Sequence, residues 1–151
     1  MTLERPARVL RGHEAIPHTA DVGIRATASD LAGLFEEAAQ AVAEIAADVQ
    51  ARAISAPESA GESVELAAAD LPALAFAWLN ELIGLLDIHG PLVRADVATV
   101  EALPDGGWRL RGRAAFGGGA RPRLDIKSAT YHGLVVERIS GGWRLTAYLD
   151  I

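Results

Sequence analysis

The segment from Asp70 to Gly90 constrains the fold most, because it reads as a helix that is apolar around most of its circumference. Asp70 is a good N-cap, Pro72 is tolerated in the first turn, and Gly90 followed by Pro91 ends the segment. The apolar residues between them are Leu74, Ala75, Trp78, Leu79, Leu82, Ile83, Leu85 and Leu86. A helix of this kind has to be covered on more than one side. A chain of 151 residues, 50% of them hydrophobic, can supply that cover within one domain.

A second helix is predicted to begin at Ser29 as N-cap, with Asp30 in its first turn. Its apolar residues recur at three- and four-residue spacing: Leu31, Leu34, Phe35, Ala38, Val42 and Ile45. The remaining segments alternate apolar and polar residues, as strands do. Strands are expected at 22–28, 64–66, 93–103, 108–116, 131–139 and 143–149, with hairpin turns at 104–107 and 140–142. This order predicts an α+β fold, with two helices packed on a largely antiparallel β-sheet in a single compact domain spanning 1–151.

Charge and composition exclude several classes of protein. The formal net charge of −6 and pI near 5.1 argue against direct binding to a nucleic-acid backbone. The chain has no cysteine, which excludes disulfides, thiol catalysis and thiolate metal sites, so any metal site is oxygen-rich or built on histidines. We find no signal peptide and expect no apolar run long enough to span a membrane, which indicates a cytoplasmic protein.

Three polar clusters interrupt the apolar segments, and the first runs from Pro17 to Asp21. One interpretation is a capped turn, because Asp and Thr side chains often bond their own backbone. The alternative is a metal site, in which the Asp21 carboxylate is a ligand and His18 either binds the metal or orients a ligand.

The second cluster runs from Ile126 to Gly133. Lys127 is either a solvated lysine or a functional one, paired with carboxylates or donating to a bound phosphate. For His132 a core position is favoured over a metal ligand or a proton carrier. Gly133 is expected to mark a β-bulge that redirects the neighbouring side chains.

The third cluster is the pair Asp150 and Ile151, which directly follows the last predicted strand. A strand that continues to the final residue places the Asp150 carboxylate beside the terminal carboxylate of Ile151. Adjacent anions repel, and a hard cation is the usual remedy, so this pair is a candidate for half of a divalent-metal site. No nucleophile elbow, Walker loop or Rossmann glycine pattern is present. The residues by themselves therefore indicate a cytosolic α+β domain with a candidate oxygen-rich metal site.

Four blocks of this sequence, taken together, resemble the motifs of the archease family. They are His18–Ile24, Trp78–Leu82 followed by Asp87, Ile126–Leu134, and Leu149–Ile151. The blocks occur in the family's order and spacing, so the resemblance extends over nearly the whole chain. The loop 117–123 is shorter and richer in glycine than the family's usual loop before the lysine motif.

Archeases are small protein cofactors of the GTP-dependent RNA ligase that joins 2′,3′-cyclic-phosphate or 3′-phosphate ends to 5′-hydroxyl ends. The resemblance therefore implies a non-enzymatic activator, which promotes guanylylation of the ligase histidine and multiple turnover in tRNA splicing or RNA repair. It also implies a divalent metal, commonly Ca²⁺ with Mg²⁺ or Mn²⁺ as alternatives, held by Asp21, Asp150 and Ile151. Lys127 matches the functional lysine near that site, and His18 and His132 are candidates to orient the ligands.

Two other functions compete with the activator hypothesis. One is a free-standing metal-dependent hydrolase that uses the same carboxylates with Lys127 and His132. The other is a general chaperone, whose usual hallmark is a large exposed apolar surface.

Overall fold

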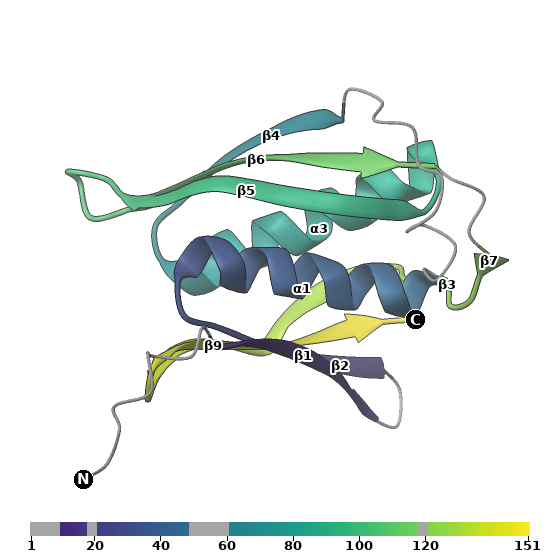
Figure 1. Cartoon of the computed structure of the whole chain (residues 1–151), viewed down its shortest axis with the longest axis horizontal. Coiled ribbons are helices and arrows are strands. Elements are labelled where there is room, and N and C mark those ends of the chain that lie inside the picture. Colours follow the sequence, from purple (N-terminus) through teal and green to yellow (C-terminus); the bar gives the residue numbers. More distant parts are fainter. Residues whose placement is uncertain (1–9, 18–20, 49–60, 118–120) are drawn as a thin grey trace, which may run out of the picture.

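The computed structural model describes residues 10–17, 21–48, 61–117 and 121–151, which form three layers (Figure 1). Helices α1 (Leu31–Ala46) and α3 (Leu71–His89) form the middle layer. A β-sheet covers each side of this layer, and each helix packs against strands of both sheets. The predicted α+β class is confirmed.

Both sheets are antiparallel throughout. The larger sheet has the strand order β1-β2-β9-β8, and the smaller one has the order β4-β6-β5. The strands of the larger sheet are β1 (Arg11–Pro17), β2 (Asp21–Ala28), β9 (Gly142–Asp150) and β8 (Ser128–Ile139). Those of the smaller sheet are β4 (Glu62–Ala68), β6 (Trp108–Phe116) and β5 (Leu92–Ala102). A short ladder joins β3 (Ala47–Asp48) to β7 (Arg121–Pro122). The sequence analysis placed both helices on one sheet, whereas the structure divides the strands between two.

Helix α3 is covered on both sides, as its apolar circumference predicts. Trp78, Leu79 and Leu82 are fully buried, and the Trp78 indole N–H donates to the Phe35 carbonyl of α1 at 2.9 Å. By length and composition alone α3 would also pass as a membrane span, with a mean hydropathy of 1.5, so the expectation of no such segment is wrong. Its buried residues lie between two sheets, which is the position of a core helix.

The helix ends follow ordinary capping chemistry. At α3 the Asp70 carboxylate accepts from the Ala73 N–H at 2.8 Å, as predicted. At α1 the N-cap is Asp30 and not Ser29, because the Asp30 carboxylate accepts from the Gly33 N–H at 2.7 Å. A side chain reaches the third N–H of a helix only from the residue directly before the first turn, which moves the start by one residue.

The strands agree with the predicted alternation, with two differences. The hairpins β5–β6 and β8–β9 are confirmed. Strand β1 was not expected, because its apolar residues are too few to show a clear period. Strand β8 begins at Ser128, three residues before the predicted start, and its register with β9 shifts between Thr130 and Val135. Gly133, at φ +76°, lies in this shift, so the predicted bulge is confirmed.

Candidate functional site

Two carboxylates and a serine lie in one row across the end of the larger sheet. Asp21 opens β2 and pairs with Asp150 of β9, and Asp150 pairs on its other side with Ser128 of β8. Side chains alternate along a strand, and the buried Ile24 and Leu149 face the helices. Asp21 and Asp150 therefore project from the sheet face that is turned away from the helices.

The two carboxylates are close enough to repel each other. Residues directly opposite in an antiparallel pair have Cβ atoms about 4.5–5.5 Å apart, and like charges there are unfavourable. Asp21 is half-buried and Asp150 is exposed, and the Ser128 hydroxyl donates to Asp150 Oδ2 at 3.3 Å. A cation between the two carboxylates would relieve repulsion between them.

Lys127 lies directly beside this pair. Its backbone N–H donates to the Asp150 carbonyl at 2.8 Å, and the residue is exposed directly before β8. It is the only lysine among the 14 Lys and Arg residues of the chain. A sequence that uses arginine at every other basic position keeps a lysine here, and this signal was open to sequence reasoning. We call Asp21, Asp150, Lys127 and Ser128 the acidic tip.

The donor chemistry of the acidic tip fits a hard divalent cation. Carboxylate and main-chain oxygens are the ligands that Ca²⁺ and Mg²⁺ prefer. The tip supplies two carboxylates, and Ile151 follows Asp150 with its main-chain oxygens. Among the residues that the structure describes, no group of three His, Cys, Asp or Glu side chains could hold a metal ion. A bound cation would therefore complete its shell with main-chain oxygens and water.

The two histidines of the predicted site have different outcomes. His18 lies outside the described residues. His132 is exposed within the bulge of β8, where its backbone N–H donates to the Thr130 hydroxyl at 3.1 Å. The expected core position of His132 is wrong, because the bulge turns this part of the strand outward. A role for His132 in orienting a ligand stays a prediction.

Comparison with known proteins identifies the family. The model of the archease protein family matches residues 13–151, a range that includes the whole acidic tip. The chain belongs to the archease family.

Named archeases are similar to this chain over nearly their whole length. The archease of Pyrococcus furiosus is 34% identical, with 94% of this chain and 100% of that protein covered. The archease of Thermococcus gammatolerans is 32% identical, with 88% and 93% covered. The solution structure of protein 1598 from Methanobacterium thermoautotrophicum has a TM-score of 0.74 at 26% identity, covering 93% of this chain and 99% of that one. The Thermotoga maritima structure, described as an archease and possible chaperone, has a TM-score of 0.54 at 18% identity, with 100% of this chain and 99% of that chain covered. At this identity the likeness shows the fold alone.

In this archease a tyrosine ring fills the sheet face next to the acidic tip. Tyr148 lies two residues before Asp150 on the same face and pairs with Gly23 of β2. A Cβ added at Gly23 would lie 2.8 Å from Tyr148 Cε1 and 2.9 Å from the Ile16 Cβ. A Cβ added at Gly133 would lie 3.0 Å from the opposite edge of the ring. The two glycines, both within archease motifs, therefore leave the space that the ring occupies.

We expect Gly23→Ala to lower the free energy of unfolding by about 1–3 kcal/mol, because the added methyl group overpacks this space. Gly84→Ala is the matched control: Gly84 is exposed in α3 with open space around it. There the same change should raise stability by about 0.5–1 kcal/mol, since glycine disfavours a helix interior. Urea unfolding measures both, and equal effects in the two variants would contradict the tight contact at Tyr148.

A second polar cluster was missed by the sequence analysis. His13 of β1 lies between two carboxylates of α1, with Nδ1 2.7 Å from Glu37 Oε1 and Nε2 2.9 Å from Glu44 Oε1. Both ring nitrogens need a proton to donate, so this geometry holds the imidazolium form. Burial acts to lower the pKa of His13, but the hydrogen bonds and charges of the two glutamates outweigh it and raise the pKa above 6.5. The charged ring ties an edge strand to the middle layer.

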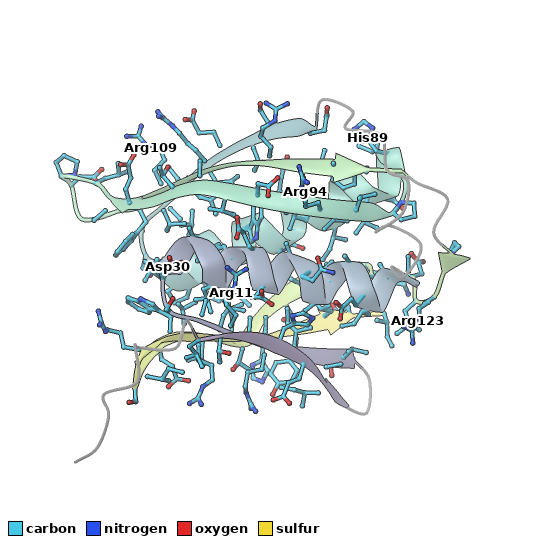
Figure 2. All side chains as sticks on the ribbon, in the orientation of Figure 1. Arg11, Asp30, His89, Arg94, Arg109 and Arg123 are labelled. Atoms are coloured by element: carbon cyan, nitrogen blue, oxygen red, sulfur yellow. The ribbon has the colours of Figure 1, made fainter. Side chains whose placement is uncertain are left out.

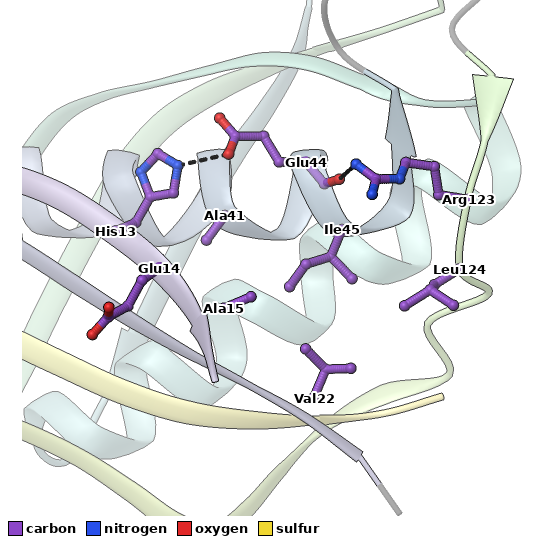
Figure 3. Close-up of a pocket in the computed structure, with 9 residues that line it drawn as sticks. All are labelled: His13, Glu14, Ala15, Val22, Ala41, Glu44, Ile45, Arg123 and Leu124. Carbon is purple, nitrogen blue, oxygen red and sulfur yellow. Dashed lines mark hydrogen bonds and ion pairs between the residues drawn. The ribbon is translucent and has the colours of Figure 1, made fainter. Parts of the chain in front are cut away.

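This histidine also borders a pocket of about 340 Å³ (Figure 3). Arg123 lies at the other end, where its guanidinium donates to the Glu44 carbonyl at 3.4 Å. Val22, which lines the pocket, is next to Asp21 in β2 but points to the opposite face of the strand. The pocket is therefore separate from the acidic tip.

The raised pKa of His13 predicts a pH-dependent stability. A group whose pKa is higher in the folded than in the unfolded protein stabilises the fold when it is protonated. For His13 this stabilisation is complete when the pH is below 6.5, the pKa of the unfolded state, and it is lost as the pH rises through the pKa of the folded state. We expect wild type to lose about 1–2 kcal/mol relative to His13→Gln across that window. His89→Gln is the control, because His89 is exposed and its Nε2 lies 3.3 Å from the carboxylate of the exposed Glu62. Parallel pH curves for wild type and His13→Gln, from urea unfolding, would exclude the charged network.

Proposed function

We propose that this archease activates a GTP-dependent RNA ligase, promoting guanylylation of the ligase histidine and multiple turnover in tRNA splicing or RNA repair. The proposal includes a cytoplasmic location and no reaction catalysed by the archease itself. The observation that supports it is the acidic tip: two opposed carboxylates and the only lysine lie together in a chain of this family.

Each residue of the tip has a distinct role in this proposal. Asp21, Asp150 and a main-chain oxygen of Ile151 hold a divalent cation, Ca²⁺ first, with Mg²⁺ or Mn²⁺ as alternatives. When bound, the cation supplies positive charge for the phosphates of GTP. The exposed ammonium of Lys127 adds a point charge beside it, which favours phosphate oxygens that gain negative charge during transfer. His18 and His132 remain the candidates for orienting the ligands.

The charge distribution favours an action through the ligase over an action on RNA. The net charge of −6 opposes contact with a phosphate backbone. The outer face of the smaller sheet does carry arginines, among them Arg94 and Arg109 (Figure 2). They pair with neighbouring carboxylates, Arg94 with Asp96 at 3.0 Å and Arg109 with Glu101 at 3.4 Å. These two pairs reduce the positive charge on this face, which an RNA-binding surface would need.

A chaperone role, as in the description of the Thermotoga protein, is the alternative within the same family. The large hydrophobic residues exposed in the described part of the chain are Ile88, Leu124, Tyr131, Val135 and Ile151. Ile88 lies in α3, Tyr131 and Val135 lie in β8, and Leu124 and Ile151 lie outside any helix or strand, whereas a surface that binds unfolded chains is expected to be contiguous. This distribution favours the activator.

The test is label transfer from α-labelled GTP to the ligase of the same organism, with substoichiometric amounts of the archease. We expect a faster guanylylation and more than one joined RNA per ligase molecule. No change in either quantity would overturn the activator proposal. RNA joining or hydrolysis without the ligase would favour the hydrolase, and stoichiometric protection of unrelated proteins from aggregation would favour the chaperone.

A further inference from the structure

The start of β8 is bound on its outer side by one side chain and not by another strand. Strand β8 is the edge of the larger sheet in the described part of the chain, so one row of its backbone groups has no neighbouring strand there. At Ala129 the Asn80 carboxamide of α3 takes that place. Asn80 Oδ1 accepts from the Ala129 N–H at 2.9 Å, and Asn80 Nδ2 donates to the Ala129 carbonyl at 3.1 Å.

Asn80 is itself held firmly. The same Nδ2 also donates to the Phe76 carbonyl one turn earlier in α3, at 3.1 Å. Both amide hydrogens and the oxygen of Asn80 are therefore hydrogen-bonded. If the amide were flipped, its NH₂ group would lie against the Ala129 N–H, and two donors would face each other. The adjacent Trp78 and Leu79 are fully buried and anchor this turn of the helix. A polar side chain on so apolar a helix is unfavourable unless it is bonded in this way.

The bond to Ala129 fixes the start of β8, which directly follows Lys127. Before Ala129, the Ser128 hydroxyl bonds the Asp150 carboxylate and the Lys127 N–H bonds the Asp150 carbonyl. The segment is thus held by β9 on one side and by Asn80 on the other. Lys127 cannot shift relative to Asp150 without breaking one of these bonds.

We propose that Asn80 is a positioning residue, which acts through the Ala129 backbone to hold the Lys127 backbone beside Asp150 in the acidic tip. The inference rests on the proposed function for its consequence, because Lys127 is taken there as the activating group. Asn80 itself makes no contact with the ligase or with GTP in this account.

The test uses Asn80→Leu, which removes all three hydrogen bonds at similar size, and Asn80→Asp, which keeps the acceptor and loses both donors. Glu81→Gln is the control, because Glu81 is the next residue of α3 and is exposed. Amide hydrogen exchange at Ala129 reports the bond directly. Lys127, as the only lysine, gives a single side-chain NMR signal after ¹³C-dimethylation. Ligase stimulation is measured for each variant alone and combined with Lys127→Ala.

For Asn80→Leu we expect exchange at Ala129 to rise by at least about tenfold and the Lys127 signal to shift. Ligase stimulation should fall, and the double variant should stimulate no less than Lys127→Ala alone, because both changes act on one group. Asn80→Asp should show the same effects more weakly. If Asn80→Leu does not fold, Asn80→Asp is the variant that tests the inference. Glu81→Gln should match wild type.

An unchanged Lys127 signal in the folded variants would overturn the inference, as would losses that add in the double variant. If wild type fails to stimulate the ligase, the proposed function fails by itself. The exchange and NMR measurements then still decide whether Asn80 positions Lys127.

Discussion

Lys127→Ala is expected to reduce stimulation of ligase guanylylation by roughly 10- to 100-fold. A positioned ammonium stabilises phosphate charge that develops in the transition state, and its loss affects the rate more than binding. The free energy of unfolding should change by less than about 0.5 kcal/mol, since Lys127 is exposed. Lys127→Arg should recover part of the activity, because the guanidinium keeps the charge but not the compact shape.

The control for this prediction is Arg25→Ala. Arg25 is an exposed cation on β2 of the same sheet, paired with Glu14 at 3.1 Å. Its loss changes the net charge equally but leaves the acidic tip intact, so stimulation should stay within about twofold. Equal losses in Arg25→Ala and Lys127→Ala would show a general charge effect and exclude a specific role for Lys127.

Asp21→Asn and Asp150→Asn should each weaken divalent-metal binding by at least about tenfold, because each removes one charged oxygen ligand from a site with few of them. The metal-free variants should be as stable as wild type or more stable by about 0.2–1 kcal/mol, since the opposed charges no longer repel. Calorimetric titration with Ca²⁺ and Mn²⁺ measures the affinity.

A thermal shift gives an independent readout of the same site. Saturating Ca²⁺ should raise the Tm of wild type and not of either variant, because a ligand stabilises only the state that binds it. Asp96→Asn is the control, as Asp96 lies on β5 of the other sheet. An unchanged affinity in Asp21→Asn or Asp150→Asn would remove that residue from the site.

Local patterns predicted most elements of this fold. The spacing of apolar residues identified both helices, and glycine-containing turns identified the β5–β6 and β8–β9 hairpins. Alternation marks a strand but does not name its partner, so the division into two sheets was not predicted. The apolar circumference of α3 was the one signal that pointed to cover on both sides, since a helix on a single sheet leaves one side in water.

The acidic tip was predicted in part. Asp21, Asp150 and Lys127 were named from the sequence, but the approach of Asp21 to Asp150 depends on pairing between β2 and β9 at opposite ends of the chain. No periodicity encodes such a pairing. Asn80 and His13 gain their roles from partners far away in sequence, Ala129 for the first and Glu37 with Glu44 for the second. Such contacts leave no local pattern.

The central place of β9 in the larger sheet has a consequence for biosynthesis. Strands β1 and β2 leave the ribosome long before β9, which lies between β2 and β8 in the finished sheet. Until β9 inserts, the β2 edge has no partner and the Asp21 carboxylate lacks Asp150 beside it. Pairing at such separation is slow and exposes unpaired edges meanwhile. A cation or ligase that recognises both carboxylates would therefore select chains whose folding is complete.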